Sequence, residues 1–288
     1  WHGASHLDDA RQAPPGHVHF DLYAQGPQTD SPYAAGEHIP GLDVGGWYDA
    51  GDFDIRTPSQ YAVVSTLALA YETFGVRWDE TPVRERDRYV AIRQPDGIPD
   101  IVQQVAHGAL ALLAQYRAIG HAIPGIVEPT LDQYTHLGDA VTKTDNLVFD
   151  SSLGSGATRG GFSGRPDDRW AFTSRNSALD YGAAAALAAA SRVLRGYDDS
   201  LAAECLRTAV RVWDEEQARE PARFRAGNTS GGRLEYEETG TTVELLVTTA
   251  GGQRYAERLE ALWPFIAANF DAVGAVASRA LPWMGAGF

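Results

Sequence analysis

Two aspartates, Asp49 and Asp52, lie three residues apart in the segment 45–52, which reads Gly-Gly-Trp-Tyr-Asp-Ala-Gly-Asp. Glycine lets the backbone adopt positive φ and approach a ligand closely, so this segment is predicted to form a turn rather than a helix. Two acids held on such a turn can hold a water molecule between them and deprotonate it. The adjoining Trp47 and Tyr48 offer flat aromatic faces on which a sugar ring could stack.

A lone Asp-x-x-Asp pair is more often a turn that caps the following helix. The whole segment is rarer than the pair, and it resembles the signature of glycoside hydrolase family 9, the inverting cellulases. Other segments resemble that family in the same order along the chain: 1–9, 97–101, 183–191 and 248–255. The resemblance covers nearly all 288 residues. It implies the family's barrel of six helix pairs, (α/α)6.

The resemblance also implies roles for the two acids. In this family the second aspartate of the signature is the general base and the first helps to hold the water. Asp52 is therefore the expected base and Asp49 its partner. Inverting hydrolysis also needs a carboxylic acid about 6.5–9.5 Å from the base, which protonates the leaving oxygen.

The general acid of the family is a glutamate near the C-terminus of the domain, and no matching segment occurs in this chain. We therefore expect the acid to lie beyond Phe288, and residues 1–288 to be a catalytic domain that is truncated at both ends. Four glutamates near the start of a predicted helix are alternative candidates: Glu235, Glu237, Glu238 and Glu244. Acids at that position complement the helix dipole, so we interpret them as structural.

The loops supply candidate substrate contacts. Tyr134 and His136 lie where relatives carry aromatic platforms, although a structural histidine in a loop fits the sequence equally well. Phe172 could stack on a sugar and Arg175 could bind its hydroxyls, with core packing of Phe172 as the alternative. Many relatives carry a lysine just after the signature. This chain has Arg56 one place later, which could supply the same charge, so the role of the position is open.

The chain offers few metal ligands. Cys205 is its single cysteine, so the cysteine-histidine zinc site of some relatives is not expected, and we interpret the thiol as a small buried side chain. No cofactor is needed for the expected chemistry, and no residue is assigned to a metal. Four loop acids could ligate a structural calcium, which some relatives bind: Asp145, Asp150, Asp167 and Asp168. Their spacing matches no defined calcium loop, which favours solvated turns.

The net charge of −14 and the pI near 4.9 argue against nucleic acid or an anionic membrane as a partner. No apolar run approaches the roughly 18 residues of a membrane span. Because the family acts on polymers, the resemblance implies a secreted protein. Carbohydrate-binding or immunoglobulin-like modules could be appended outside this chain.

Long helices must position these residues. Apolar periodicity, start signals and glycine stops predict helices over 59–75, 98–119, 199–215, 240–250 and 253–270. Another is expected to end at Leu194 with Asn176 as its N-cap. Trp263 is predicted to be a core residue, and the stretches 125–128 and 146–149 to pair locally in loops. The predicted fold class is all-α, and six or seven helices amount to the N-terminal half to two-thirds of an (α/α)6 barrel.

The expected function is endoglucanase-like hydrolysis of β-1,4-glucosidic bonds in cellulose or related β-glucans, with inversion, and weak activity for this chain alone. A non-catalytic relative that binds glycans is one alternative. An exo-acting β-glucosidase or β-glucosaminidase of the same family is another. A polysaccharide lyase is disfavoured, because an acidic chain with one lysine offers no basic cleft for a uronate.

Overall fold

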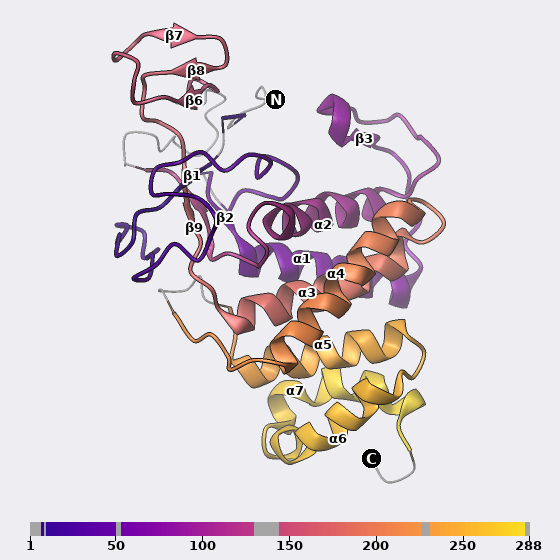
Figure 1. Ribbon diagram of the computed structural model, residues 1–288. Helices are drawn as coiled ribbons and strands as arrows, with labels where there is room; N and C mark the ends of the chain where they lie inside the picture. The colour runs from indigo at the N-terminus through magenta and orange to yellow at the C-terminus, as the bar shows by residue number, and fades with distance from the viewer. Residues whose placement is uncertain (1–6, 9, 50–52, 130–143, 226–230, 286–288) are drawn as a thin grey trace.

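The computed structural model describes residues 7–8, 10–49, 53–129, 144–225 and 231–285 (Figure 1). Its helices are α1 (Thr57–Phe74), α2 (Asp100–Ala118), α3 (Ser177–Leu194), α4 (Asp199–Gln217), α5 (Leu234–Thr248), α6 (Gln253–Ala268) and α7 (Phe270–Ala277). The short 3-10 helices are η1 (Glu85–Asp87) and η3 (Ser278–Trp283). These elements confirm the predicted all-α class.

The helices form an arc of consecutive pairs. Helix α3 packs against both α1 and α5, so these three lie side by side, and each also packs against the helix that follows it in the chain (Figure 1). Helix α7 and η3 pack against α5 at the end of the arc. Pairs of this kind, with one helix of each pair touching the next pair, build an α/α toroid.

Alanine explains the central position of α3. Its side chains from Ala183 to Ala190 are buried, apart from Ala185, because small side chains let neighbouring helices approach closely. The helix begins where the Asn176 side chain accepts a hydrogen bond from the Ala178 amide at 2.8 Å, which confirms the predicted cap. At the other end of the arc, α1 stops at Gly75 in the left-handed conformation.

A four-stranded sheet covers the ends where α1 and α3 begin. Its order is β1 (Arg11–Gln12), β9 (Trp170–Phe172), β5 (Gly125–Val127) and β2 (Ile55–Arg56). The remaining strands are β3 (Val83–Arg84), β4 (Tyr89–Val90), β6 (Val148–Phe149), β7 (Thr158–Arg159) and β8 (Phe162–Ser163). Strand β2 leads directly into α1, so the sheet fixes where the chain enters the helical arc.

Several local expectations need correction. Helix α5 begins at Leu234, six residues before the predicted start at 240, and α7 was not expected. The stretches around 126 and 148 are strands, but β5 pairs with β2 and β9, whereas β6 pairs with β8. Trp263 is 41% exposed on α6 and is not a core residue. Cys205 is fully buried as predicted, and burial raises the pKa of its thiol to about 12.

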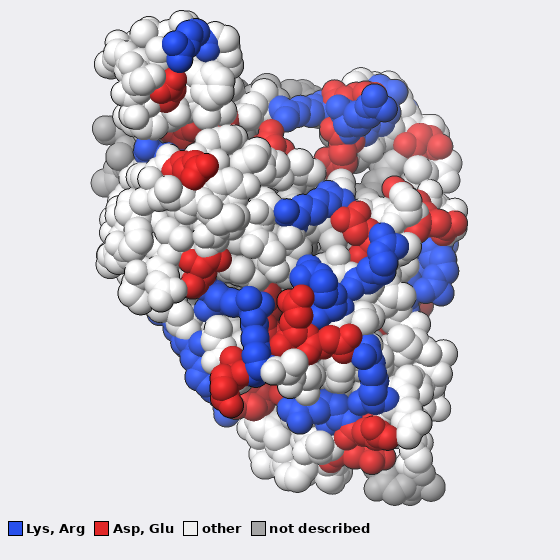
Figure 2. Space-filling model, viewed as in Figure 1, with Lys and Arg blue, Asp and Glu red and all other residues white. Residues whose placement is uncertain are grey.

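Acidic and basic side chains are interleaved over the helices on the face shown in Figure 2, without one large basic field. Many of them form surface ion pairs, such as Arg117 with Glu204 at 2.7 Å and Arg254 with Asp214 at 2.7 Å. None of the helices in the described part of the chain has the length and apolar character that crossing a bilayer requires.

Candidate active site

The two glycines that open the signature turn lie against α2. Gly45 has φ 64° and Gly46 has φ 81°, both in the region that favours glycine. A Cβ atom on Gly45 would lie 2.2 Å from the His107 carbonyl oxygen, which is closer than any real contact. The turn therefore requires glycine both for its conformation and for its approach to the helix.

His107 on α2 fixes this turn through its two ring nitrogens. Its Nε2 lies 2.6 Å from the Gly46 carbonyl oxygen, and its Nδ1 lies 2.5 Å from Glu85 Oε1. Both partners are acceptors, so the ring makes both hydrogen bonds only when both nitrogens carry a proton. Burial opposes that charge, but the hydrogen bond and charge of Glu85 outweigh it and raise the pKa of His107.

Trp47 anchors the middle of the turn. Gln60 on α1 pairs with its backbone, accepting from the Trp47 amide at 2.9 Å and donating to the Trp47 carbonyl at 2.9 Å. The indole Nε1 donates to Gln104 Oε1 at 3.1 Å, and the ring packs partly buried against the core between α1 and α2. Tyr48 is 36% exposed, so of the two aromatic residues it offers the more accessible face.

Asp49 is held through both its backbone amide and its carboxylate. Its amide donates to the Asp54 carbonyl at 2.9 Å, and its Oδ2 lies 2.9 Å from Arg56 Nε. Arg56 Nε also lies 2.8 Å from Oδ2 of the buried Asp54, which the Tyr23 hydroxyl binds at 2.6 Å. Arg56 therefore orients the first signature carboxylate. The second, Asp52, lies outside the described residues.

Arg169 also contacts the turn. It is fully buried just before β9, and its Nη1 donates to the Phe53 carbonyl. Its guanidinium also lies 5.4 Å from the centre of the Tyr48 ring. Residues on α1, on α2 and in the segment before β9 therefore all contact the turn and fix its position.

The remaining residues predicted to contact substrate are Phe172, Arg175, Tyr134 and His136. Phe172 is fully buried and packs against Tyr23 and His17, so the hypothesis that it stacks on a sugar is wrong and core packing replaces it. Arg175 faces carboxylates, with Nε 3.4 Å from Asp180 Oδ2, and its contact with sugar hydroxyls stays a prediction. Tyr134 and His136 lie outside the described residues.

The four alternative candidates for the general acid all lie on α5. Glu237 accepts from the Tyr61 hydroxyl at 2.9 Å and from the Gly232 amide at 3.0 Å, and burial raises the pKa of its carboxyl. Glu238 accepts from Gln217 and Arg258, each at 2.7 Å. Glu244 binds Arg192 at 2.7 Å and also contacts Arg279, while Glu235 lies in the first turn of the helix. These contacts give Glu237, Glu238 and Glu244 structural roles.

Sequence reasoning missed His107, Gln60 and Arg169. Their contacts with the turn join residues 13 to 116 positions apart, and no local pattern marks them. The helical periodicity of apolar residues along α2 places His107 on a helix, but it does not indicate which side chain meets the turn.

Comparisons with known proteins agree with the geometry. The family model described as glycosyl hydrolase family 9 matches residues 1–263. No curated protein sequence matches the chain.

Solved structures share the fold. A metagenome-derived glycoside hydrolase family 9 endoglucanase aligns with a TM-score of 0.61 and 20% identity, over 92% of this chain and 40% of its own. The family 9 endoglucanase J30 aligns with a TM-score of 0.55 and 21% identity, over 90% of this chain and 41% of its own. A single-mutant thermostable endoglucanase from Alicyclobacillus acidocaldarius aligns with a TM-score of 0.54 and 20% identity. The alignment covers 87% of this chain and 44% of that structure's chain. The chain thus spans less than half of each of these structures, and its helical arc is part of an (α/α)6 barrel.

Proposed function

The chain belongs to glycosyl hydrolase family 9, and on that premise we propose that it carries the water-activating half of a β-glucan hydrolase. The substrate class is cellulose or a related polymer with β-1,4-glucosidic bonds. One observation carries the proposal: Asp49 is held by Arg56 on a glycine turn that α1, α2 and Arg169 immobilise together. Catalytic carboxylates need such a rigid support, because small displacements are costly to the rate.

The proposed mechanism assigns each acid one task. Asp52, as the general base, takes a proton from a water molecule that Asp49 helps to hold. The activated water attacks the anomeric carbon on the face opposite to the leaving sugar, which inverts the configuration. A carboxylic acid on the other side of the bond protonates the leaving oxygen. Arg56 keeps Asp49 in place while the water is deprotonated.

The general acid is the remaining requirement. Glu237, Glu238 and Glu244 are engaged by neighbouring side chains, and the solved relatives are more than twice as long as the aligned region. We propose that the acid is supplied by residues outside these 288. General acid catalysis contributes about 10²–10⁴-fold, so this chain alone should hydrolyse unactivated glucan only weakly. Since the substrate is a polymer, we also propose that the protein acts outside the cell.

The test compares two substrates and follows the first-formed anomer by NMR. We expect the purified chain to act weakly on a soluble cellulose derivative. It should act measurably on a dinitrophenyl β-cellobioside, whose leaving group needs no protonation, and release the α-anomer. Release of the β-anomer would contradict inversion. Binding of cello-oligosaccharides with no turnover of either substrate would favour a non-catalytic glycan-binding protein instead.

A further inference from the structure

One guanidinium group meets three carboxylates beside the signature turn. Arg56 Nε donates to Asp54 Oδ2 at 2.8 Å and lies 2.9 Å from Asp49 Oδ2. Its Nη2 lies 3.9 Å from Asp21 Oδ2. The Nε atom carries a single proton, which cannot point equally well at both of its near neighbours. The interaction of Arg56 with Asp49 therefore depends on how strongly Asp54 attracts the same N–H group.

Tyr23 binds the same oxygen of Asp54. Its hydroxyl donates to Oδ2 at 2.6 Å, so this oxygen accepts from Tyr23 and from Arg56 at once. Tyr23 and Asp54 are both fully buried, where water does not compete and a hydrogen bond to a charged group is strong. Burial, and after it the Asp54 carboxylate, raises the pKa of Tyr23, so its hydroxyl keeps the proton and remains a donor.

Strand β5 leaves room for the Tyr23 ring. Gly125 on this strand pairs with Arg56 on β2. A Cβ atom on Gly125 would lie 2.8 Å from Tyr23 Cε1 and 2.6 Å from the Ile55 carbonyl oxygen, which is closer than Cβ atoms approach other atoms. On its other contacts the ring packs against Phe172, with the two centroids 5.5 Å apart. The hydroxyl thus reaches Asp54 from a ring whose position is fixed by the sheet and the core.

We propose that Tyr23 is a positioning residue for Asp49 and acts through Asp54 and Arg56. By donating to Asp54 Oδ2, the hydroxyl offsets part of the negative charge that attracts Arg56. More of the guanidinium charge is then available to Asp49. Without the hydroxyl, Arg56 moves toward the buried Asp54 and releases Asp49. The consequence for turnover rests on the proposed function, in which Asp49 holds the attacking water, but the contacts can be measured without substrate.

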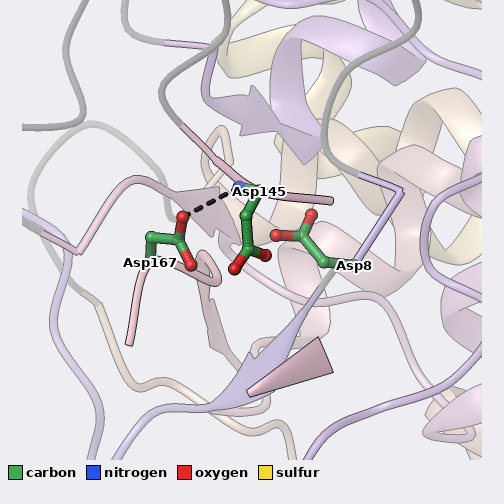
Figure 3. Close-up of side chains that lie close together, drawn as sticks. All are labelled: Asp8, Asp145 and Asp167. Carbon is green, nitrogen blue, oxygen red and sulfur yellow. Dashed lines mark hydrogen bonds between the residues drawn. The ribbon is translucent and has the colours of Figure 1, made fainter. Parts of the chain in front are cut away.

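A second group of carboxylates supplies a control. Asp8, Asp145 and Asp167 come from the segments before β1, β6 and β9, and each offers one oxygen within 4.8 Å of the others (Figure 3). Calcium binding by the loop acids stays a prediction. Asp145 forms no ion pair with Arg56 in the described part of the chain. Asp145→Asn therefore removes a carboxylate without changing the contacts of Arg56.

The first test follows the Nε–H signal of Arg56 by NMR in the purified chain, and Arg56→Lys identifies this signal by its loss. We expect Asp49→Asn to move the signal upfield, because the N–H group loses a charged neighbour. In a Tyr23→Phe background the same replacement should move it much less, because Arg56 has already turned to Asp54. Equal movement in the two backgrounds would overturn the proposal.

Matched variants separate this coupling from a general loss of structure. Tyr33→Phe removes the hydroxyl of another partly buried tyrosine of the same N-terminal segment. Neither Tyr33→Phe nor Asp145→Asn should alter the response of the signal to Asp49→Asn. Asp54→Asn leaves only a neutral acceptor beside Arg56, so adding Tyr23→Phe to it should have no further effect on the signal. A further shift in that double variant would show that Tyr23 acts by a route other than Asp54.

Turnover of dinitrophenyl β-cellobioside gives the functional readout. We expect Tyr23→Phe to lower kcat by about 10-fold, with KM nearly unchanged because the buried ring does not contact substrate. Tyr33→Phe should keep both constants. A raised KM with unchanged kcat in Tyr23→Phe would contradict the proposal. If the wild-type chain shows the NMR coupling but no turnover, the positioning of Asp49 by Tyr23 is supported and the proposed hydrolytic function is not.

Discussion

At the residue scale, the position of the signature turn depends on a proton. His107 bridges the Gly46 carbonyl and Glu85, and both are acceptors. A neutral imidazole can donate to only one of them, so the loss of one proton removes one of the two hydrogen bonds.

This arrangement predicts a pH dependence. The folded-state pKa of His107 lies above the ordinary 6.5, so its stabilising contribution is complete below pH 6.5 and is lost as pH rises through the folded pKa. We expect the urea midpoint of the wild-type chain to fall over that range. In His107→Gln, which cannot gain charge, this step should be absent. An identical fall in the variant would show that other groups cause it.

The residues of the site were predictable only in part. The run from Gly45 to Asp52 carries its own conformational signal, because glycines at that density require a turn. For Phe172 the sequence leaves sugar stacking and core packing open, since its burial depends on Tyr23 and His17, which lie more than a hundred residues away. A sequence pattern reports local conformation, whereas exposure is decided by the packing of distant segments.

At the scale of elements, the long helices were predictable because periodicity, caps and stops recur in each. The short strands were not, because two or three residues contain no period and their partners lie far away in sequence. Helix α5 begins earlier than expected, since residues 234–240 include three glutamates, a threonine and a glycine and so show no clear apolar periodicity.

The start of α3 offers a test at this scale. Asn176 Oδ1 caps the Ala178 amide at 2.8 Å, and its Nδ2 donates to the Phe224 carbonyl at 2.5 Å. We expect Asn176→Ala to lower the free energy of unfolding by about 1–2 kcal/mol, measured by urea denaturation. Asn176→Asp keeps the cap acceptor and should lose less. Equal losses in the two variants would mean that the cap contributes little.

At the scale of the molecule, the arc leaves apolar side chains on α1 exposed. Val63 is 39% exposed and Leu69 is 46% exposed. Apolar residues occur on all sides of this helix. A helix of that composition is normally covered on every side. In a closed toroid α1 would have a neighbour on both flanks, whereas in the described residues its helical neighbours are α2 and α3.

Exposed apolar faces of this kind promote association. We expect sedimentation velocity to show that the 288-residue chain self-associates as its concentration rises, and the double variant Val63→Ser, Leu69→Ser to stay monomeric over a wider range. Replacing the exposed Thr66 on the same helix by serine is the control and should change nothing. Wild-type chain that remains monomeric at all concentrations would contradict this expectation.

The central claim is that the signature turn activates water, and Asp52 is the residue on which it depends. The most direct measurement is the turnover of dinitrophenyl β-cellobioside by the wild-type chain, by Asp52→Asn and by the surface control Asp214→Asn. General-base catalysis predicts a loss of at least about 10²-fold in Asp52→Asn and no change in Asp214→Asn. Small nucleophiles such as azide should restore part of the lost rate. Equal turnover by Asp52→Asn and the wild-type chain would contradict the account.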